Sequence, residues 1–448
     1  MSPLFRPSPW FFALVLSQGL LAWCARDQDT WPLLPAFLAT SFLLLSRVRP
    51  ATLSLRTFFL ISLFLRLLFL SVPIGLSDDI YRYLWDGEMT RNGVGPFHLA
   101  PVDVPVPLRP SGLFDQLNSP HYDSIYPPVA QICFWLASLF LSDPPSASIL
   151  ILRLILGLAE VTALYFLSLL ARGNTSRLVW YAWNPFVLLE TWGSPHVESL
   201  LLPCLAGFLL ALTTRRPTTA ALALTLATWT KLWPVLLFPF LLRQTSLRQW
   251  RNVLGISALA SAALWLPFLS PEMTGGFARS ADLYVRSFEF NAGFYYFLKW
   301  SSTEAGLLLG LLDPGSETSK IVGPLLRWLL LATVGFLFLY AWKTHPIRLT
   351  GWIYLAFLLS LTTVHPWYLL PIFLLLPLTT SSSAPWACLA ISSAATYLFY
   401  SHGIYWPFVI VGWMLWGLLM FSEHLHRRQF PFPVLEDDGP GEPTTLQW

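Results

Sequence analysis

Two adjacent acids, Asp78 and Asp79, are the residues whose type and spacing point most directly to chemistry. Neighbouring carboxylates repel each other and lose hydration at a membrane surface, so a cation must compensate them. Arg82 follows one helical turn later and predicts a local ion pair beside a helix cap, which is the purely structural interpretation. The functional interpretation is a general base, with the second carboxylate orienting it or binding a divalent cation, Mg²⁺ or Mn²⁺.

Other polar residues interrupt apolar surroundings further along the chain. His196 and Glu198 are two positions apart, so they can meet in a turn but not on one helix face; a polar cap at the membrane interface is an equal alternative. Lys231 breaks an apolar hairpin, and an anion site is favoured over a side chain that reaches for a headgroup. His365, followed by Pro-Trp-Tyr, is typical of an interfacial aromatic belt, with a hydrogen bond to sugar or phosphate as the alternative. Arg153 and Glu160, seven positions apart, share one helix face, and a structural bridge between them and a functional role are equal alternatives.

The elements that must position these residues are membrane helices. Of 448 residues, 55% are hydrophobic and 11% charged, against about 25% charged in soluble domains, and the mean hydropathy is +0.57. The apolar residues form runs that approach the roughly 20 residues a helix needs to cross the hydrocarbon core. The sequence therefore predicts an all-α, polytopic transmembrane helical bundle with about 12–14 spans. The expected helices cover residues 8–25, 31–46, 56–75, 147–171, 177–192, 196–213, 218–230, 232–242, 252–269, 321–342, 347–364, 367–380, 384–399 and 403–420.

The positions of Lys and Arg predict the topology, because short basic loops stay in the cytoplasm. Such loops are 47–56, 172–177, 215–216, 243–251, 343–348 and 424–428. This orientation places both termini inside and the long loop 76–126 outside, and it makes 127–141 and 294–312 interfacial helices on the outer face. Residues 1–428 then form one membrane domain, and the acidic tail 429–448 is expected to be disordered in the cytoplasm.

Several classes of partner are excluded or implied by what the sequence contains. The net charge of +3 is small and scattered, which argues against nucleic acid. Glycine-rich phosphate loops and the motifs of serine hydrolases or zinc proteases are absent from the sequence. A sugar or phosphate donor is therefore expected to arrive through the membrane as a lipid.

Five short motifs carry a family resemblance: 77–87, Gly95-Pro96-Phe97, Tyr126-Pro127-Pro128, Trp183-Asn184-Pro185 and Pro195-His196-Val197-Glu198. In this order, over about residues 56–245 and with 365–368, the chain resembles the GT-C membrane glycosyltransferases. It is most similar to polyprenyl-phosphate-mannose-dependent mannosyltransferases of bacteria. It differs in that the acid pair follows the third expected span instead of the first, and Ser194-Pro195 replaces a glycine-rich approach to His196.

The resemblance implies an inverting transfer of a hexose, mannose first, from a polyprenyl-phosphate carrier to a lipid or glycan acceptor outside a bacterial inner membrane. Asp78 or Asp79 would be the base, and both are the metal candidates. Arg82 and Lys231 would bind the donor phosphate. The substrate-binding residues would be Tyr81, Asp86, His196, Glu198 and His365.

Three other functions compete with this one. A multi-pass transporter or flippase of lipid-linked sugars would bury its charges at the midplane and show paired halves, and no clear internal repeat is visible. A scaffold protein would leave the acid pair incidental. A third alternative keeps the fold and transfers another sugar, or aminoarabinose.

Overall fold

The computed structural model describes residues 8–48, 53–73, 75–110, 112–142, 144–270, 275–280, 288–310, 318–400, 402–427 and 432. These residues form a helical protein, with one isolated parallel bridge between Phe290 and Thr363. The predicted all-α bundle is confirmed. The tail 429–448, expected to be disordered, lies outside the described residues except for Phe432, whose ring stacks on Trp386.

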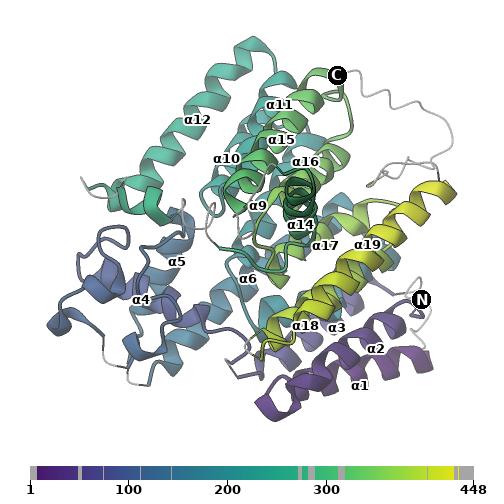
Figure 1. Ribbon diagram of the computed structural model, residues 1–448, viewed down its shortest axis with the longest axis horizontal. Helices are drawn as coiled ribbons and strands as arrows, with labels where there is room; N and C mark the ends of the chain where they lie inside the picture. Colours follow the sequence, from purple (N-terminus) through teal and green to yellow (C-terminus); the bar gives the residue numbers. More distant parts are fainter. Residues whose placement is uncertain are drawn as a thin grey trace.

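The N-terminal half builds two groups of helices (Figure 1). Helix α4 packs against α5, and this pair lies at the left of the view, while α1, α2 and α3 lie together at the lower right. The long helix α6 contacts α5, and its Glu160 pairs with Arg66 of α3, so it links the two groups. The α-helices of this half are α1 (Pro9–Cys24), α2 (Leu34–Leu45), α3 (Leu55–Leu70), α4 (Asp79–Arg91), α5 (Pro128–Ser138), α6 (Ser146–Leu170), α7 (Thr175–Ala182), α8 (Pro185–Leu188), α9 (Glu198–Thr213) and α10 (Pro217–Thr228).

The C-terminal half completes the bundle around α9 and α10. Helix α10 packs on α12, α15 on α16, and the hairpin of α18 and α19 returns to α2. The α-helices here are α11 (Phe238–Arg243), α12 (Leu247–Trp265), α14 (Gly293–Leu308), α15 (Ser319–Tyr340), α16 (Pro346–Ser360), α17 (Leu370–Leu375), α18 (Ala384–Phe399) and α19 (Trp406–Arg427). Short helical turns are η1 (Gln28–Leu33), η2 (Pro101–Asp103), η3 (Val106–Leu108), η4 (Phe114–Gln116), the π-turn η5 (Leu189–Gly193), η6 (Trp233–Leu237), η7 (Leu266–Phe268), η8 (Pro366–Leu369) and η9 (Leu376–Leu378).

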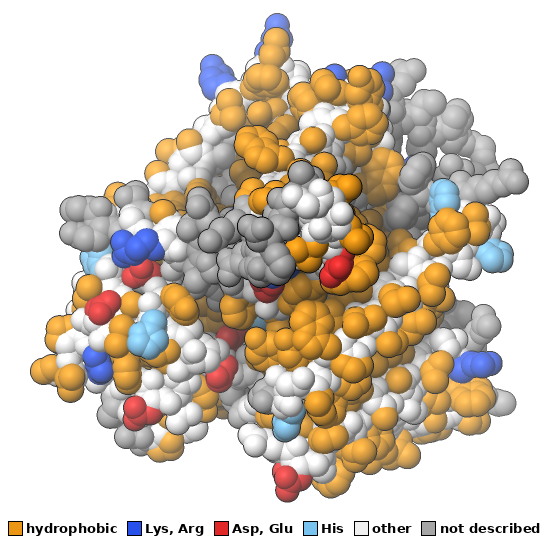
Figure 2. Space-filling model, in the orientation of Figure 1, with side chains coloured by type: hydrophobic (Ala, Val, Ile, Leu, Met, Phe, Trp, Pro, Cys, Tyr) orange, Lys and Arg blue, Asp and Glu red, His pale blue; other side chains and the backbone are white. Residues whose placement is uncertain are grey.

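Three helices in the described part of the chain are long and apolar enough to cross a membrane alone: Ser146–Leu170, Ile321–Tyr340 and Trp406–His426. Large apolar side chains also stay exposed along the surfaces of α3, α12, α15 and α19. In Figure 2 hydrophobic side chains cover much of the visible face, Lys and Arg lie at its upper and right-hand edges, and acids lie at the left, where basic side chains accompany them, and at the bottom and centre. A protein with this surface is a membrane protein, because water does not stabilise apolar area of that extent.

Several of the expected spans are divided into shorter elements, and 232–242 forms η6 and α11 in succession. The helix that starts at Thr175 ends at Ala182, and the side-chain oxygen of Asn184 accepts hydrogen bonds from the backbone of Phe186 and Val187 to start α8. This is the break that Trp183-Asn184-Pro185 predicts, since proline cannot continue a helix without losing a hydrogen bond. The chain then passes through η5 and an irregular turn, so α9 begins at Glu198. Residues 367–380, expected as one helix, form η8, α17 and η9 in succession.

Candidate functional site

The acid pair lies at the start of α4, just after the linker from α3. Asp79 is the first residue of the helix and half-buried, whereas Asp78 is exposed. The amide nitrogen of Asn118 lies 2.6 Å from Oδ1 of Asp78 and 3.2 Å from Oδ1 of Asp79 and donates to both. Burial raises the pKa of Asp79 to about 6; the charges of Asp78 and Glu198 add to the rise, and Asn118 and Lys231 oppose it. A carboxylate that is ionised at neutral pH yet unusually basic is suited to take a proton from a hydroxyl.

Arg82 is buried in the scaffold of loop 76–126 and pairs with Asp86. The ion pair with Asp78 or Asp79 that its spacing had suggested is therefore not formed. The Nε of Arg82 donates to Oδ1 of Asp86 at 2.8 Å, and its Nη1 donates to the carbonyl of Ser119 at 3.1 Å. The other carboxylate oxygen of Asp86 accepts a hydrogen bond from Ser124 at 2.5 Å. Arg82 therefore fastens the loop next to Asn118, and it acts on the acid pair through that residue.

Lys231 lies in the connection between α10 and η6, where it forms an ion pair with Glu198 at the start of α9. Its ammonium also lies 3.6 Å above the ring of Tyr368. Burial lowers the pKa of Lys231, and the negative charges of Glu198 and Asp79 oppose that shift. The charges of Lys231 and Asp79 therefore influence each other, although the two residues are about 150 positions apart in the sequence.

His196 and Glu198 turn to different partners and do not meet in the turn, which was one of the two arrangements that the sequence allowed. His196 is 1% exposed and its Nδ1 lies 3.6 Å from Oε2 of Glu190 in η5, while Glu198 pairs with Lys231. The irregular backbone between η5 and α9 separates the two side chains. A buried carboxylate and a buried imidazole therefore face each other beside the acid–lysine cluster.

An aromatic stack joins the histidines. The ring of His196 stacks on Trp367 with centroids 3.6 Å apart, and Trp367 stacks on His365 at 4.5 Å. His365 in turn stacks on Phe290 at 5.1 Å. Burial, with the charge of Lys231 adding to it, lowers the pKa of His365 to about 3, so its imidazole is neutral at physiological pH. The stack fixes the ring orientations of both imidazoles.

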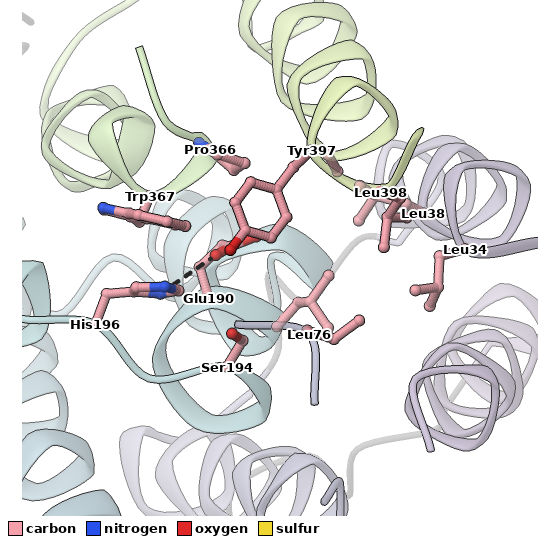
Figure 3. A pocket seen from close by; sticks show the side chains of 12 residues that line it. Leu34, Leu38, Leu76, Glu190, Ser194, His196, Pro366, Trp367, Tyr397 and Leu398 are labelled. Carbon is pink, nitrogen blue, oxygen red and sulfur yellow. Dashed lines mark ion pairs between the residues drawn. The ribbon is translucent and has the colours of Figure 1, made fainter. Parts of the chain in front are cut away.

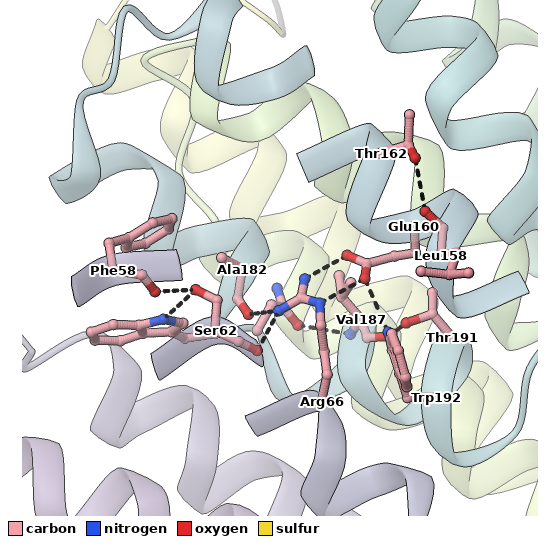
Figure 4. A network of polar contacts seen from close by, with 12 residues as sticks. Phe58, Ser62, Arg66, Leu158, Glu160, Thr162, Ala182, Val187, Thr191 and Trp192 are labelled. Atoms are coloured by element: carbon pink, nitrogen blue, oxygen red, sulfur yellow. Dashed lines mark hydrogen bonds and ion pairs between the residues drawn. The ribbon is translucent and has the colours of Figure 1, made fainter. Parts of the chain in front are cut away.

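A buried ion pair supports the broken segment from inside the bundle (Figure 4). Arg66 of α3 binds both carboxylate oxygens of Glu160 of α6, at 2.7 and 2.5 Å, and both side chains are at most 1% exposed. Arg66 also donates to the carbonyl of Ala182 at 3.0 Å, where α7 ends. The indole of Trp192 donates to Glu160 at 3.0 Å. The ion pair thus binds both sides of the helix break.

Arg153 forms a second clamp. The bridge to Glu160, which its spacing had left open, is not formed. Arg153 donates to the carbonyl of Val72 at 2.7 Å and to that of Trp192 at 2.6 Å. The first carbonyl lies six residues before Asp78, and the second lies four residues before His196. Gly157 makes room for this contact, because a Cβ there would come within 2.7 Å of the Trp192 ring.

A pocket opens beside the acid pair between α2, η5, η8 and α18 (Figure 3). Glu190, Ser194, His196 and Tyr397 line its polar side. Tyr397 interacts with Ser77 and with the carboxylates of Asp79, Asp78 and Glu190, so its phenol joins the pocket to the acid pair.

The structure thus brings together only some of the predicted site residues. Asp78, Asp79, Glu198 and Lys231 share one cluster, with the histidine stack beside it. Arg82 and Asp86 lie in the scaffold of the loop, and Tyr81 packs half-buried against the apolar cluster of α4, α5 and α6. Sequence reasoning missed Asn118, Glu190 and Tyr397 as site residues. Only Glu190 carried a signal, as an acid in an apolar stretch.

The residues also allow a test of the expected divalent cation. Among the described residues, no group of three or more His, Cys, Asp or Glu is arranged to hold a metal. Asp78 and Asp79 do point one oxygen each at the Asn118 amide, and a turn of that amide would add its carbonyl oxygen as a third ligand. Three oxygen ligands with water fit Mg²⁺ or Mn²⁺, so the cation stays a prediction.

The fold and this site define a membrane-embedded enzyme whose carboxylates and lysine meet where helices are broken. Residues 33–245 match the family model of the alpha-(1->6)-mannopyranosyltransferase N-terminal domain. This segment covers just under half of the chain and contains the acid pair, His196 and Lys231. The resemblance to membrane mannosyltransferases is confirmed over this segment, and the chain is a glycosyltransferase. None of the curated proteins matches the chain.

Proposed function

We propose that this glycosyltransferase moves mannose, with inversion, from a polyprenyl-phosphate carrier to a lipid or glycan acceptor on the outer face of the membrane. The observation that carries the proposal is the shared site of Asp79 and Lys231. A base and a fixed cation lie together among broken helices, within reach of a substrate that arrives in the lipid. The family description supports mannose as the sugar and the primary 6-hydroxyl of a sugar as the acceptor group.

In this mechanism Asp79 takes the proton of the acceptor hydroxyl while the hydroxyl oxygen attacks the anomeric carbon. The bond from that carbon to the phosphate oxygen breaks, and polyprenyl phosphate leaves with the electron pair. Lys231 stabilises the charge that develops on the leaving phosphate, which makes a second carboxylate nucleophile unnecessary. Asp78 and Asn118 orient the base. Arg82 holds the loop that carries Asn118, and so it acts as a positioning residue and not as a phosphate ligand.

The test uses purified protein in lipid nanodiscs with labelled polyprenyl-phosphate mannose and a panel of mannoside acceptors. Asp79→Asn should abolish transfer, because the amide cannot accept the proton. Asp103→Asn, an exposed acid of the same outer loop, is the matched control and should keep full activity. Turnover retained after Asp78 and Asp79 are both converted to Asn would exclude a carboxylate base at this site.

The outer-face location has its own test. Asn118 neighbours the acid pair, so Ser119→Cys in a cysteine-free background reports on the same side of the membrane. Impermeant thiol reagents added to intact cells should label this cysteine. Labelling that occurs only in inside-out vesicles would place the site in the cytoplasm and contradict transfer on the outer face.

A further inference from the structure

Four aromatic side chains from distant parts of the chain meet at the C-terminal end of α12. Phe97 belongs to the loop between α4 and α5 and is 1% exposed. The centre of its ring lies 5.7 Å from that of Trp265 and 5.6 Å from that of Phe277. Trp265 in turn meets the ring of Trp229 edge-on, with the centres 5.3 Å apart. These four rings, the aromatic cluster, connect the α4–α5 loop to a residue two positions before Lys231.

The helical turn after η7 lies directly on the same loop. A Cβ on Gly276 would collide with the carbonyl oxygen of Phe97, so this close approach requires glycine. The hydroxyl of Ser280 donates to the carbonyl of Asp123 at 2.6 Å. Arg279 donates to the carboxylate of Asp123 at 2.9 Å. The loop is therefore fixed to the segment that follows α12 by a close backbone contact and two hydrogen bonds.

Trp229 is held through both its side chain and its backbone. Its indole N–H donates to the hydroxyl of Ser261 in α12 at 2.8 Å. Its carbonyl accepts a hydrogen bond at 3.1 Å from the backbone N–H of Val129, at the start of α5. The backbone N–H of Lys231 donates to the carbonyl of Ala227 in α10 at 3.0 Å. The peptides that carry the lysine are thus tied to α5, α10 and α12, which contact one another (Figure 1).

The ammonium of Lys231 depends on this support for its position. It pairs with Glu198 and lies over the ring of Tyr368, but both contacts are made at the end of a long, flexible side chain. The place of such a charge is set by the backbone from which the side chain starts. A displacement of about 1 Å at a reacting site costs about 100-fold in rate. Groups that hold the backbone at Trp229 therefore control how the lysine meets a ligand.

We propose that Trp229 is a positioning residue for Lys231, and that the aromatic cluster makes the position of the lysine depend on the α4–α5 loop. The inference rests on the proposed function for the role of Lys231 at the donor phosphate. The same loop carries Asn118, which donates to both acids of the pair. One scaffold thus places the phosphate ligand and the base relative to each other.

The first experiment is a double-mutant cycle in nanodiscs, measured by equilibrium binding of radiolabelled polyprenyl phosphate and by transfer kinetics. Trp229→Phe keeps an aromatic ring but removes the hydrogen bond to Ser261. It should raise the Kd for polyprenyl phosphate and the donor KM by about 2–10-fold, the value of one neutral hydrogen bond, with the acceptor KM unchanged. In the Lys231→Ala background it should change neither. Ser261→Ala removes the same hydrogen bond and should reproduce the result. Trp250→Phe is the matched control, because it removes an indole hydrogen bond of 2.8 Å at the other end of α12, and should leave donor binding unchanged.

Two adjacent glycines test the part played by the loop. Gly276→Ala pushes the helical turn away from the loop and should raise the same Kd, again only while Lys231 is present. Gly275→Ala is the matched control, since a Cβ there meets only the end of the Arg279 side chain, at 3.4 Å. Phe277→Leu removes an aromatic contact without a backbone collision and should also raise the Kd if Gly276→Ala does not fold. Wild-type binding of polyprenyl phosphate by folded Gly276→Ala and Phe277→Leu proteins would overturn the inference.

The remaining outcomes separate the inference from the proposed function. Losses of polyprenyl phosphate binding that depend on Lys231, without transfer of mannose to any acceptor, would support the positioning role and refute the mannosyltransfer. Transfer in which the losses from Trp229→Phe and Lys231→Ala multiply would overturn the positioning role alone, because Trp229 would then act independently of the lysine. Binding that Lys231→Ala leaves unchanged would remove the lysine from the phosphate site and overturn the inference with it.

Discussion

The Asn118 amide is the most sensitive point for testing Asp79 as the base, because it touches the carboxylate without being part of the reaction. Replacing it by leucine removes the hydrogen bonds to both acids and keeps the size of the side chain. Those bonds stabilise the ionised form, so their loss must raise the pKa of Asp79 further. The acid limb of the pH–rate profile should then move to higher pH.

The size of the shift follows from the geometry. A hydrogen bond to a charged group contributes about 1.5–3 kcal/mol, and the low end applies here because the 3.2 Å contact is partly exposed to solvent. About 1.4 kcal/mol corresponds to one pKa unit, which moves the pKa of Asp79 from about 6 to roughly 7. At pH 6 the ionised fraction falls from about one half to about one tenth, whereas at pH 8 it stays above roughly nine tenths. Activity should therefore fall about fivefold at pH 6 and hardly at all at pH 8.

The assay is kcat/KM for the acceptor between pH 5 and 9, with donor at saturation. Asn92→Leu is the matched control, since Asn92 makes a similar bond to Glu88 at the other end of α4; it should leave the acid limb in place. An Asn118→Leu profile that superimposes on the wild type would refute Asp79 as the titrating base. A uniform loss at every pH would mean that the substitution disturbs the loop and not the titration.

Three further results are expected. Lys231→Ala should raise the apparent KM for the lipid donor by about 10–100-fold, which corresponds to the loss of one charged hydrogen bond. Lys299→Ala is the control, because it removes a different ion pair, with Glu289, and should leave the donor KM unchanged. An unchanged donor KM in Lys231→Ala would remove Lys231 from the phosphate site. Arg66→Met should lower the free energy of unfolding by about 3–5 kcal/mol, because it leaves the buried carboxylate of Glu160 unpaired. The double variant Arg66→Met with Glu160→Leu should recover most of this stability. Thermal unfolding of the purified variants measures both effects, and a double variant no more stable than the single one would contradict the assignment of Glu160 as the buried charge. A chelator should slow turnover if the acid pair holds a divalent cation, and restoration by Mg²⁺ or Mn²⁺ is the confirming measurement.

The helical architecture was predictable because a membrane leaves the backbone few choices. Apolar runs must hydrogen-bond within themselves, so hydropathy predicts helices and proline predicts their interruptions. The break at Asn184 follows from that rule, since Asn caps the next helix and Pro185 starts it. The π-turn at Leu189–Gly193 does not follow from it. That turn depends on contacts from α3 and α6, which the local sequence does not encode.

The sequence indicated which charged residues matter, but it did not indicate which groups they bond to. Arg153 and Glu160 lie on one helix face, and the sequence leaves open whether they pair with each other. Each bonds instead to groups of other elements, Glu160 to Arg66 and Arg153 to backbone carbonyls. Spacing along one helix identifies only partners on that helix, whereas in a helical bundle the charged side chains can also bond to groups of neighbouring elements. Asn118 was missed for the same reason, because only the folded loop brings it to the acids.

These buried charges explain how an enzyme can keep irregular backbone at membrane depth. A helix break exposes carbonyls that lipid cannot satisfy, and each one costs free energy unless a donor is built in. Arg66 satisfies the carbonyl where α7 ends, and Arg153 satisfies that of Trp192 after η5. Arg153 bonds through the same guanidinium to Val72, just before the acid pair. The groups that stabilise the break therefore also fix the segment of His196 against that of Asp79, so the stability of the broken helix and the geometry of the site depend on the same side chains.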